Sequence, residues 1–363
     1  MSSLLKVGIT HGDVNGIGYE VLLKAFSDDR LLELFCPVIY GSSKSASYYR
    51  KMLEGDAVNF HIISKADESQ EGKINLVNCV RDEIRIEPGT ASAEAGESAY
   101  IALDQAAADL AKGKIDLLVT LPINKDSIQN EKFQFPGHTE FLEDRFAKEE
   151  EKALMILATE VLRVALVTTH VPIAEVPSKL SKELILEKLN TLDESLKRDF
   201  LLENPRIAVL GLNPHAGENG LLGREEIDII APAVREAQDK WILCAGPFPA
   251  DGFFGSGRFR EFDAILAMYH DQGLIPFKTL AMDAGVNFTA GLPIVRTSPD
   301  HGTAYNIAGK NQASEESFRQ AIYMGMDILK NRRFYDEARK NPLKKMFFDR
   351  GKDDEKLDLT KEE

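Results

Sequence analysis

The sequence has few cysteines, and their arrangement excludes two common scaffolds. Its 363 residues include only Cys36, Cys79 and Cys244, which lie far apart and form no CxxC pair. Three separated cysteines build neither a disulfide framework nor a cysteine-cluster zinc site, and they are typical of a reducing compartment. We therefore expect a cytoplasmic protein.

Long apolar runs and an excess of basic charge are also missing. No stretch reaches the roughly 18 apolar residues of a membrane span, and no charged-then-apolar secretion signal precedes the strand-like run 7–10. Acidic side chains outnumber basic ones by 58 to 44, a formal net charge of −14. An acidic surface repels phosphate backbones and anionic lipids, so we expect neither nucleic acid nor a membrane as partner. A small anionic substrate in a locally basic pocket stays compatible with this charge.

What the sequence does have is an alternation of short apolar runs with longer helical patterns. The alternation indicates an α/β fold with a largely parallel sheet, and the length corresponds to about two domains. The predicted strands are Leu5–Ile9, Pro37–Tyr40, Ile74–Val77, Leu117–Leu121, Leu154–Ala158, Arg163–Thr168, Arg206–Leu210 and Ala264–Met268. The predicted helices are Gly18–Phe26, Glu94–Lys112, Thr139–Ala147, Ser181–Leu196, Arg224–Asp239 and Glu315–Lys330. The mostly charged segment Lys344–Glu363 is predicted to be a loosely held tail.

A glycine-rich turn follows the first predicted strand. The spacing of Gly12, Gly16 and Gly18 fits neither the GxGxxG dinucleotide fingerprint nor the GxxxxGK[ST] phosphate loop. Glycines at such a position serve either a tight turn alone or the close approach of the backbone to a ligand. The carboxylate of Asp13 inside the turn favours a ligand site.

Three histidines each follow a predicted strand. They are His170, His215 and His270. In open α/β sheets ligands bind beyond the carboxyl ends of the strands, and imidazole is the commonest ligand of divalent transition metals. We interpret the three as candidate metal ligands, with ordinary loop histidines as the alternative. Asp251 and Asp271 lie close enough in sequence to orient a ligating histidine or to bind the metal themselves.

A second group of polar residues indicates an anion site. His138 and Thr139 stand at the start of a predicted helix, of which Thr139 is a candidate N-cap, and free amides at a helix start attract anions. Lys278, Asn287 and Arg296 occur in an otherwise apolar stretch, where isolated cations indicate recognition of carboxylate or phosphate. Simple helix capping and an internal ion pair are the alternatives.

These strings resemble the 4-hydroxythreonine-4-phosphate dehydrogenase family of vitamin B6 biosynthesis. Similar segments occur in the same order at 8–18, 136–142, 168–172, 211–220, 269–278, 286–293 and 296–304. The resemblance implies an isocitrate/isopropylmalate dehydrogenase-like fold, in which two α/β/α domains flank a cleft. We expect residues 1–135 with 285–363 to form a cofactor-side domain, and residues 136–284 to form a metal and dimerisation domain.

The resemblance also implies roles for individual residues. His170, His215 and His270 would bind a divalent metal (Zn, Mg, Mn or Co), in a homodimer whose metal site is shared between subunits. The phosphorylated substrate would contact His138, Thr139, Lys278, Asn287 and Arg296. NAD or NADP would contact Gly12, Asp13, His301, Gly302, Thr303 and Asn306. The candidate catalytic residues are Lys278, Asp251 and Asp271, and either Lys278 or Asp251 would be the general base.

The implied activity is NAD(P)-dependent oxidation of 4-phosphooxy-L-threonine to a β-keto acid. This acid loses CO2 to give 3-amino-2-oxopropyl phosphate, in pyridoxal phosphate biosynthesis. One alternative is a sister dehydrogenase of phosphorylated threonate or erythronate sugar acids. Another is a metallohydrolase that uses the histidines to activate water, and a third is a metal- or phosphate-binding module without catalysis.

Some positions depart from the family pattern. His11 stands near the cleft, where relatives commonly have Met. A replacement of this kind could accompany a change of substrate. Asn306 stands where relatives often have an acid that holds a ribose hydroxyl, which leaves the choice between NAD and NADP open. The helical region 174–204 and the segment beyond Lys330 make the chain longer than we expect for the family.

Overall fold

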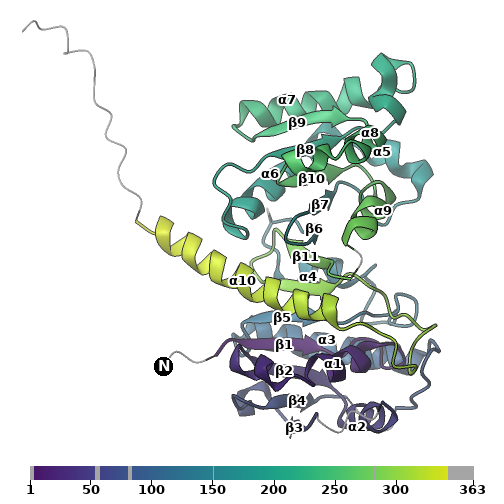
Figure 1. Cartoon of the computed structure of the whole chain (residues 1–363), viewed down its shortest axis with the longest axis vertical. Helices are drawn as coiled ribbons and strands as arrows, with labels where there is room; N and C mark the ends of the chain where they lie inside the picture. The colour runs from purple at the N-terminus through teal and green to yellow at the C-terminus, as the bar shows by residue number, and fades with distance from the viewer. Residues whose placement is uncertain (1–3, 54–57, 81–83, 150, 282, 342–363) are drawn as a thin grey trace, which may run out of the picture.

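The protein has an α/β fold built on one long, twisted sheet with helices on both faces (Figure 1). This computed structural model describes residues 4–53, 58–80, 84–149, 151–281 and 283–341, so the predicted tail Lys344–Glu363 lies outside the described residues. The α/β fold predicted from the sequence is confirmed. Among the described residues, no helix has both the length and the apolar character needed to cross a membrane.

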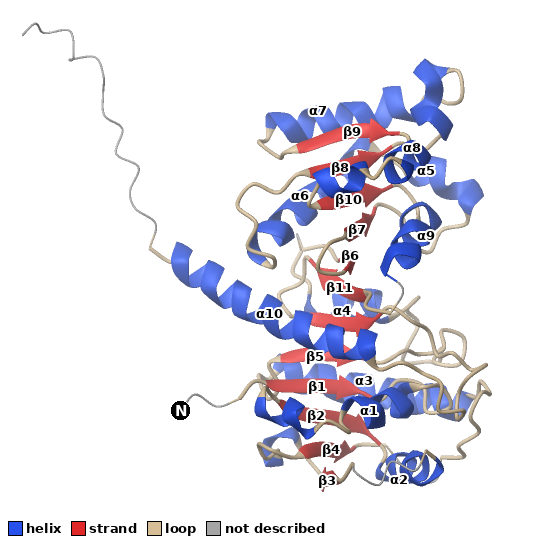
Figure 2. Cartoon of the chain, in the orientation of Figure 1, coloured by secondary structure: helices blue, strands red, loops and turns tan. Residues whose placement is uncertain are grey.

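The sheet contains two parallel blocks joined by antiparallel strands. β11 pairs antiparallel with β12 and β6, and β6 pairs antiparallel with β7. In Figure 2 the arrowheads of β1 and β2 in one block and of β8 and β9 in the other point toward the same side. The strand order is β3 (Phe60–Ile63), β4 (Ile74–Asn78), β2 (Cys36–Gly41), β1 (Lys6–Thr10), β5 (Leu117–Thr120), β12 (Arg296–Pro299), β11 (Val286–Ala290), β6 (Leu154–Ala158), β7 (Arg163–Leu166), β10 (Ala264–Ala267), β8 (Ile207–Leu210) and β9 (Cys244–Phe248).

The helices form largely where the periodicity predicts them, with three differences at their ends. The helix predicted over Arg224–Asp239 starts with a π-helical turn, Glu226–Ile230, and is α-helical only from Ala231. The last helix does not stop at Lys330, since no glycine or proline lies between Lys330 and Arg339. Thr139 is not an N-cap, because α4 begins at His138 and Gly137 occupies the cap position without a side-chain hydrogen bond. The α-helices are α1 (Gly18–Ala25), α2 (Ser43–Met52), α3 (Ala93–Ala111), α4 (His138–Phe146), α5 (Val176–Lys179), α6 (Lys182–Arg198), α7 (Ala231–Asp239), α8 (Ala250–Gly255), α9 (His270–Ala281) and α10 (Glu316–Arg339).

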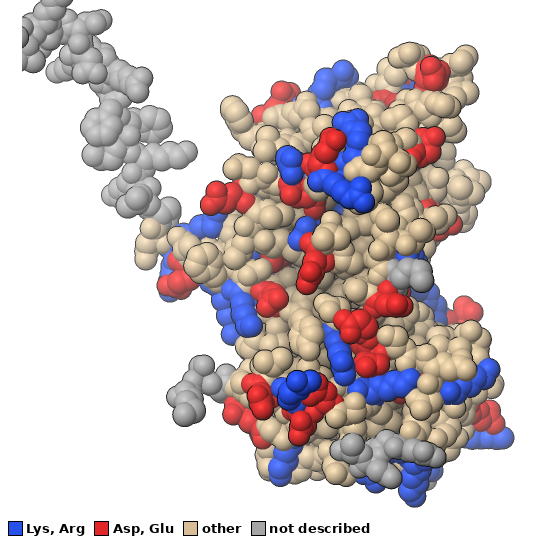
Figure 3. Space-filling view, in the orientation of Figure 1, with Lys and Arg blue, Asp and Glu red and all other residues tan. Residues whose placement is uncertain are grey.

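Apolar clusters fill the space between sheet and helices. Phe141 and Leu142 of α4 pack in one cluster with Leu103 of α3 and Leu118 of β5, so α4 contacts the block that contains β1. The division of the chain into residues 1–135 with 285–363 and residues 136–284 stays a prediction. Acidic and basic side chains are interspersed on the face shown in Figure 3, so the net charge of −14 does not gather there in one acidic patch.

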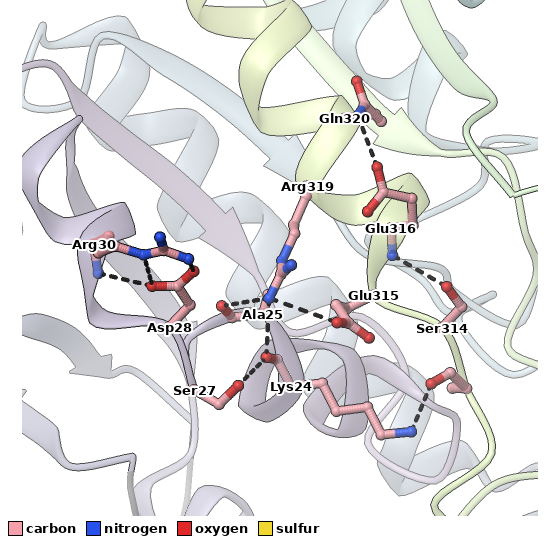
Figure 4. A network of polar contacts seen from close by, with 11 residues as sticks. Lys24, Ala25, Ser27, Asp28, Arg30, Ser314, Glu315, Glu316, Arg319 and Gln320 are labelled. Carbon is pink, nitrogen blue, oxygen red and sulfur yellow. Dashed lines mark hydrogen bonds and ion pairs between the residues drawn. The ribbon is translucent and has the colours of Figure 1, made fainter.

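α10 and the segment before it are fastened to α1 by polar contacts (Figure 4). The guanidinium of Arg319 donates to the carbonyl oxygens of Lys24 and Ala25 at the end of α1, at 3.5 and 3.4 Å. A cation at this end of a helix is stabilised by the helix dipole. The Nζ of Lys24 donates in turn to the carbonyl of Ala313 at 2.6 Å, which fixes the end of the segment 301–313.

Candidate functional site

A cavity of about 200 Å³ lies where β5, β11 and β12 meet the start of α4. Three of the five predicted substrate-contact residues line it, namely His138, Asn287 and Arg296. Its lining is Thr120, Pro122, Ile123, Lys125, Gly137, His138, Asn287, Arg296, Ser298, Pro299, Asp300, His301 and Gly302. A larger hollow of about 700 Å³ lies between the turn after β6 and α10, but it contains none of the predicted site residues.

Arg296 is the fixed cation of this cavity. Its side chain is buried, and its Nε and one terminal nitrogen donate to Thr120 Oγ1 at 3.0 and 2.6 Å while the other donates to Thr289 Oγ1 at 3.1 Å. Burial lowers the pKa of Arg296 to about 10, which leaves it charged at neutral pH. Because arginine has five N–H donors, two remain for a ligand after these three bonds.

Three buried polar atoms on the cavity wall have no hydrogen-bond partner among the described residues. They are His138 Nε2, Asn287 Oδ1 and His301 Nε2. Burial and the neighbouring charges of Arg296 and Lys125 hold the pKa of His138 well below its usual value, so its imidazole is neutral and keeps one N–H to donate. Unpaired buried polar groups are costly, and their convergence indicates that a polar ligand completes this site.

Lys278 reaches the same cavity from α9. Its Nζ lies 3.4 Å from Oδ1 of Asp300, a cavity residue that directly follows β12. Burial raises the pKa of Asp300, and the charge of Lys278 offsets part of this increase. Lys278 thus lies beside the cavity, and its role in the site stays a prediction.

The three candidate metal histidines follow three strands that are neighbours in the sheet. β10 pairs in parallel with β7 on one side and with β8 on the other. The rings of His170 and His270 are 6.3 Å apart between centroids, and His270 Nδ1 lies 2.7 Å from Asp271 Oδ1. His215 stands on the adjacent loop with 66% of its side chain exposed.

One chain offers two imidazoles, of His170 and His270, and the carboxylate of Asp271 as possible donors to a divalent metal. Two imidazoles that face each other suit zinc, cobalt or a similar ion, and a carboxylate on one of them is the usual orienting group. Among the described residues, however, no three His, Cys, Asp or Glu side chains converge closely enough to hold a metal ion. The described part of one chain therefore brings two of the candidate ligands together, His170 and His270, and places His215 on the loop after the neighbouring strand.

Sequence reasoning missed Lys125 and Glu140. Lys125 Nζ lies 2.7 Å from His170 Nε2, and Glu140 Oε1 lies 3.7 Å from His170 Nδ1. Burial lowers the pKa of Lys125. The pKa of Glu140 is also lowered, because the interaction with His170 and the charge of Lys125 outweigh the increase that burial causes. Lys125 follows β5 closely, so the strand-end rule that selected the histidines points to it too.

Two predicted residues lie apart from the cavity. Thr139 does not line it, although its neighbour His138 does. Asp251 is exposed on α8, a helix that packs against the loop of His215.

The glycine-rich turn packs against protein. A Cβ on Gly12 would lie 2.4 Å from the carbonyl oxygen of Pro122, and one on Gly16 would lie 2.8 Å from that of Thr303. The Asp13 carboxylate is buried and accepts a 2.7 Å hydrogen bond from the hydroxyl of Tyr305. The turn thus holds the segment 301–310, in which Asn306 is exposed.

His11, which we expected near the cleft, is an interior residue. Its side chain is fully buried behind the turn, stacks on Tyr19 at 5.5 Å and lies 3.3 Å from Ser98 Oγ. It does not line the cavity. A histidine at this position therefore carries no direct information about the substrate.

Comparison with known proteins decides the family. Residues 33–325 match the model of the family described as "Pyridoxal phosphate biosynthetic protein PdxA". The chain belongs to this family. A 4-hydroxythreonine-4-phosphate dehydrogenase from Bacteroides thetaiotaomicron is 55% identical over 98% of this chain and 97% of its own length.

Other family members extend this comparison to structure and to a second substrate. The solved structure of 4-hydroxythreonine-4-phosphate dehydrogenase from Klebsiella pneumoniae superposes with a TM-score of 0.77 and 35% identity, covering 90% of this chain and 100% of that chain. A protein from Oceanobacillus iheyensis, provisionally named D-threonate 4-phosphate dehydrogenase, is 37% identical over 90% of this chain and 99% of its own length. The recognition of the family from the sequence is confirmed.

Proposed function

We propose that this PdxA family member is an NAD(P)- and divalent-metal-dependent dehydrogenase that oxidises 4-phosphooxy-L-threonine. The product is a β-keto acid, which loses CO2 to give 3-amino-2-oxopropyl phosphate in pyridoxal phosphate biosynthesis. The observation that carries the proposal is a cationic cavity with unpaired polar groups directly beside the histidine pair. The 55% identical relative bears the name of this activity.

The phosphate group of the substrate would lie in the cavity. Arg296 would offer its two remaining N–H groups, His138 a neutral N–H donor, and Asn287 a further polar contact, with Thr139 contributing at the first turn of α4. Lys125 adds a second positive charge at the wall toward His170. Contacts to a group remote from the reacting carbon supply binding energy that fixes the alcohol for reaction.

The reacting end of the substrate would lie toward the histidines. His170, His270 and His215 would hold a divalent metal, which when bound supplies Lewis acidity, while the nicotinamide accepts the hydride. Lys278, in its uncharged form, would take the alcohol proton at its Nζ, since this atom lies 3.4 Å from Asp300 of the cavity wall and its helix begins at His270. Asp271 would orient the imidazole of His270, with which it already shares a 2.7 Å contact.

We also propose a homodimer in which the metal site is shared between subunits. Apolar side chains are exposed close in sequence to the metal histidines: Ile173 is 73% exposed, Leu221 79% and Leu222 45%. A second copy would cover them and would bring His215 and Asp251 into a complete site. Nucleic acid and membranes have no part in this proposal.

The dinucleotide, NAD or NADP, would bind along residues 301–306. His301, Gly302, Thr303 and Asn306 would contact it. Asp13 would hold this segment in place through Tyr305, and Gly12 would let the turn pack closely on Pro122. An uncharged Asn306 repels a 2′-phosphate less than an acid does, so both cofactors belong in the test.

Cys36, Cys79 and Cys244 are free thiols, which supports a cytoplasmic location.

The test is the formation of reduced nicotinamide from 4-phosphooxy-L-threonine, with and without a chelator. We expect turnover with NAD or NADP, loss of turnover on chelation and recovery on adding a divalent metal. Turnover that persists in the chelated protein contradicts the metal assignment. Failure to bind any dinucleotide in calorimetry contradicts the dehydrogenase and supports a metallohydrolase.

D-Threonate 4-phosphate is the second candidate substrate, because the relative from Oceanobacillus iheyensis carries that name. It shares the phosphate and the secondary alcohol with the first candidate and has a hydroxyl in place of the amine. A comparison of kcat/KM for the two compounds, measured side by side with the same metal and cofactor, decides between them.

A further inference from the structure

His215 stands at the start of an unusual left-handed turn. Every residue from 215 to 220 has a positive φ, and His215 itself has φ 54° and ψ 27°. Side chains other than glycine avoid this region, because the Cβ approaches the backbone oxygen. His215, Ala216, Glu218 and Asn219 nevertheless adopt it together, so contacts outside the turn must hold the conformation.

The side chain that holds it is Glu226. This carboxylate is 3% exposed, and it lies in the π-helical turn Glu226–Ile230 that precedes α7. Its Oε1 accepts the backbone N–H groups of Leu212 and Asn213 at 2.8 and 2.7 Å, and its Oε2 accepts the side-chain amide of Asn213 at 3.0 Å. A buried carboxylate with three N–H donors fixes the chain that enters the turn.

The glycines around the turn fit this carboxylate closely. A Cβ on Gly217, where φ is +80°, would lie 2.6 Å from Glu226 Oε2, and one on Gly211 would lie 3.2 Å from Oε1. The carbonyl of Gly211 also accepts the Nε2 of Gln272, two residues beyond His270, at 2.5 Å. The loop of His215 is thus held on one side by Glu226 and on the other by the helix that carries His270.

We propose that Glu226 is a positioning residue for the metal site. It acts through His215, whose imidazole it presents by stabilising the left-handed turn, and it touches neither substrate nor metal. The inference rests on the proposed function in one respect, namely that His215 is a metal ligand.

The test compares cobalt(II) binding to the chelator-treated full-length protein and its variants by titration calorimetry and by the visible absorption of the bound ion. Groups that orient a metal ligand typically contribute 10- to 100-fold in affinity. We expect Glu226→Gln, which replaces one of the two accepting oxygens with an N–H donor beside the N–H donors of Leu212 and Asn213, to weaken cobalt binding by that factor and to alter the absorption band. Glu225→Gln is the matched control, because Glu225 accepts only the side chain of Asn213 and should bind cobalt nearly as the parent does.

A double variant shows whether the effect passes through His215. In a His215→Ala background, Glu226→Gln should cause no further loss of affinity; an equal further loss overturns the proposal. If His215→Ala weakens binding and Glu226→Gln does not, the role of Glu226 is refuted while the metal site stands. If His215→Ala leaves cobalt affinity unchanged, the metal assignment itself is refuted, and the role of Glu226 with it.

A milder substitution covers the case in which Glu226→Gln does not fold. Asn213→Ala removes the donor to Oε2 and leaves both backbone N–H groups on Glu226. Circular dichroism establishes folding. A folded Asn213→Ala protein should bind cobalt several-fold more weakly, and affinity equal to the parent overturns the proposal.

Discussion

The Nζ of Lys278 and the Oδ1 of Asp300 lie 3.4 Å apart across the candidate site. Lys278 belongs to α9, which begins at His270, whereas Asp300 directly follows β12 at the wall of the phosphate cavity. This one pair therefore links the histidine end of the site to its anion end. It also places the Nζ of Lys278 where a substrate alcohol would meet both ends.

Replacement of Lys278 tests its role in proton transfer. We expect Lys278→Met to lower kcat by about 10²- to 10⁴-fold, the usual contribution of a general acid or base, while dinucleotide binding stays intact. Lys330→Met is the control, because Lys330 is an exposed lysine on α10 that is likewise near an aspartate, Asp327, at 3.8 Å. Steady-state kinetics with calorimetric cofactor binding measures both, and an unchanged kcat excludes Lys278 as the base.

Replacement of Arg296 tests whether the cavity binds the phosphate group of the substrate. Arg296→Lys keeps the charge but loses the planar fork that bonds Thr120 and Thr289 while facing the cavity. We expect kcat/KM for the phosphorylated substrate to fall by about 10- to 100-fold, since hydrogen bonds to charged groups contribute roughly 1.5–3 kcal/mol. Arg333→Lys, on the exposed side of α10, should leave kinetics unchanged. Equal kinetics of both variants would show that the substrate phosphate lies elsewhere.

Because the imidazole of His11 is buried, we expect the folded protein to lose stability in mild acid. Burial lowers its pKa from 6.5 to about 4, so protonation favours the unfolded chain as pH falls from 6.5 toward 4. This residue should cost the folded state about 3 kcal/mol over that interval, since one pKa unit corresponds to about 1.4 kcal/mol. His11→Met should remove this part of the decline in the free energy of urea unfolding. Parallel pH profiles for both proteins contradict the assignment.

The ion pair of Asp199 and Arg332 predicts a large loss of stability on disruption. Both side chains are buried, Arg332 Nε lies 2.6 Å from Asp199 Oδ1, and the pair fastens α10 to the end of α6. We expect Asp199→Ala to cost about 3–5 kcal/mol, because it leaves a buried charge unpaired. Asp336→Ala breaks a second pair between the same helices, with the more exposed Arg198, and should cost less than about 1 kcal/mol. Denaturant unfolding compares the two.

Much of the architecture could be predicted because apolar periodicity marks it. All eight predicted strands form, since each is a short run of Val, Ile, Leu or Ala buried on both faces. Four strands, β3, β9, β11 and β12, escaped prediction. In β11 and β12 the reason is that Asn287, Thr289, Arg296 and Ser298 interrupt any apolar pattern. Those polar residues line the cavity or form a hydrogen bond with Arg296. The residues that the site needs therefore remove the apolar pattern by which these strands could be predicted.

The candidate site was predictable only in part. His138, Asn287 and Arg296 could be selected as isolated polar groups, and the structure brings them to one cavity. Lys125 was missed, because its significance arises from a contact with His170, 45 residues later in the chain. The left-handed turn was equally beyond sequence reasoning, since four residues other than glycine adopt a backbone that their own preferences disfavour.

The continuous sheet has a consequence for motion. The ladder runs from β5 to β12, on to β11 and β6, and then to β7, with no gap between the two parallel blocks. The two blocks cannot rotate relative to each other about a flexible linker, because such a movement would have to break these hydrogen bonds. Any movement between the blocks must instead spread as a small change of twist over several strands.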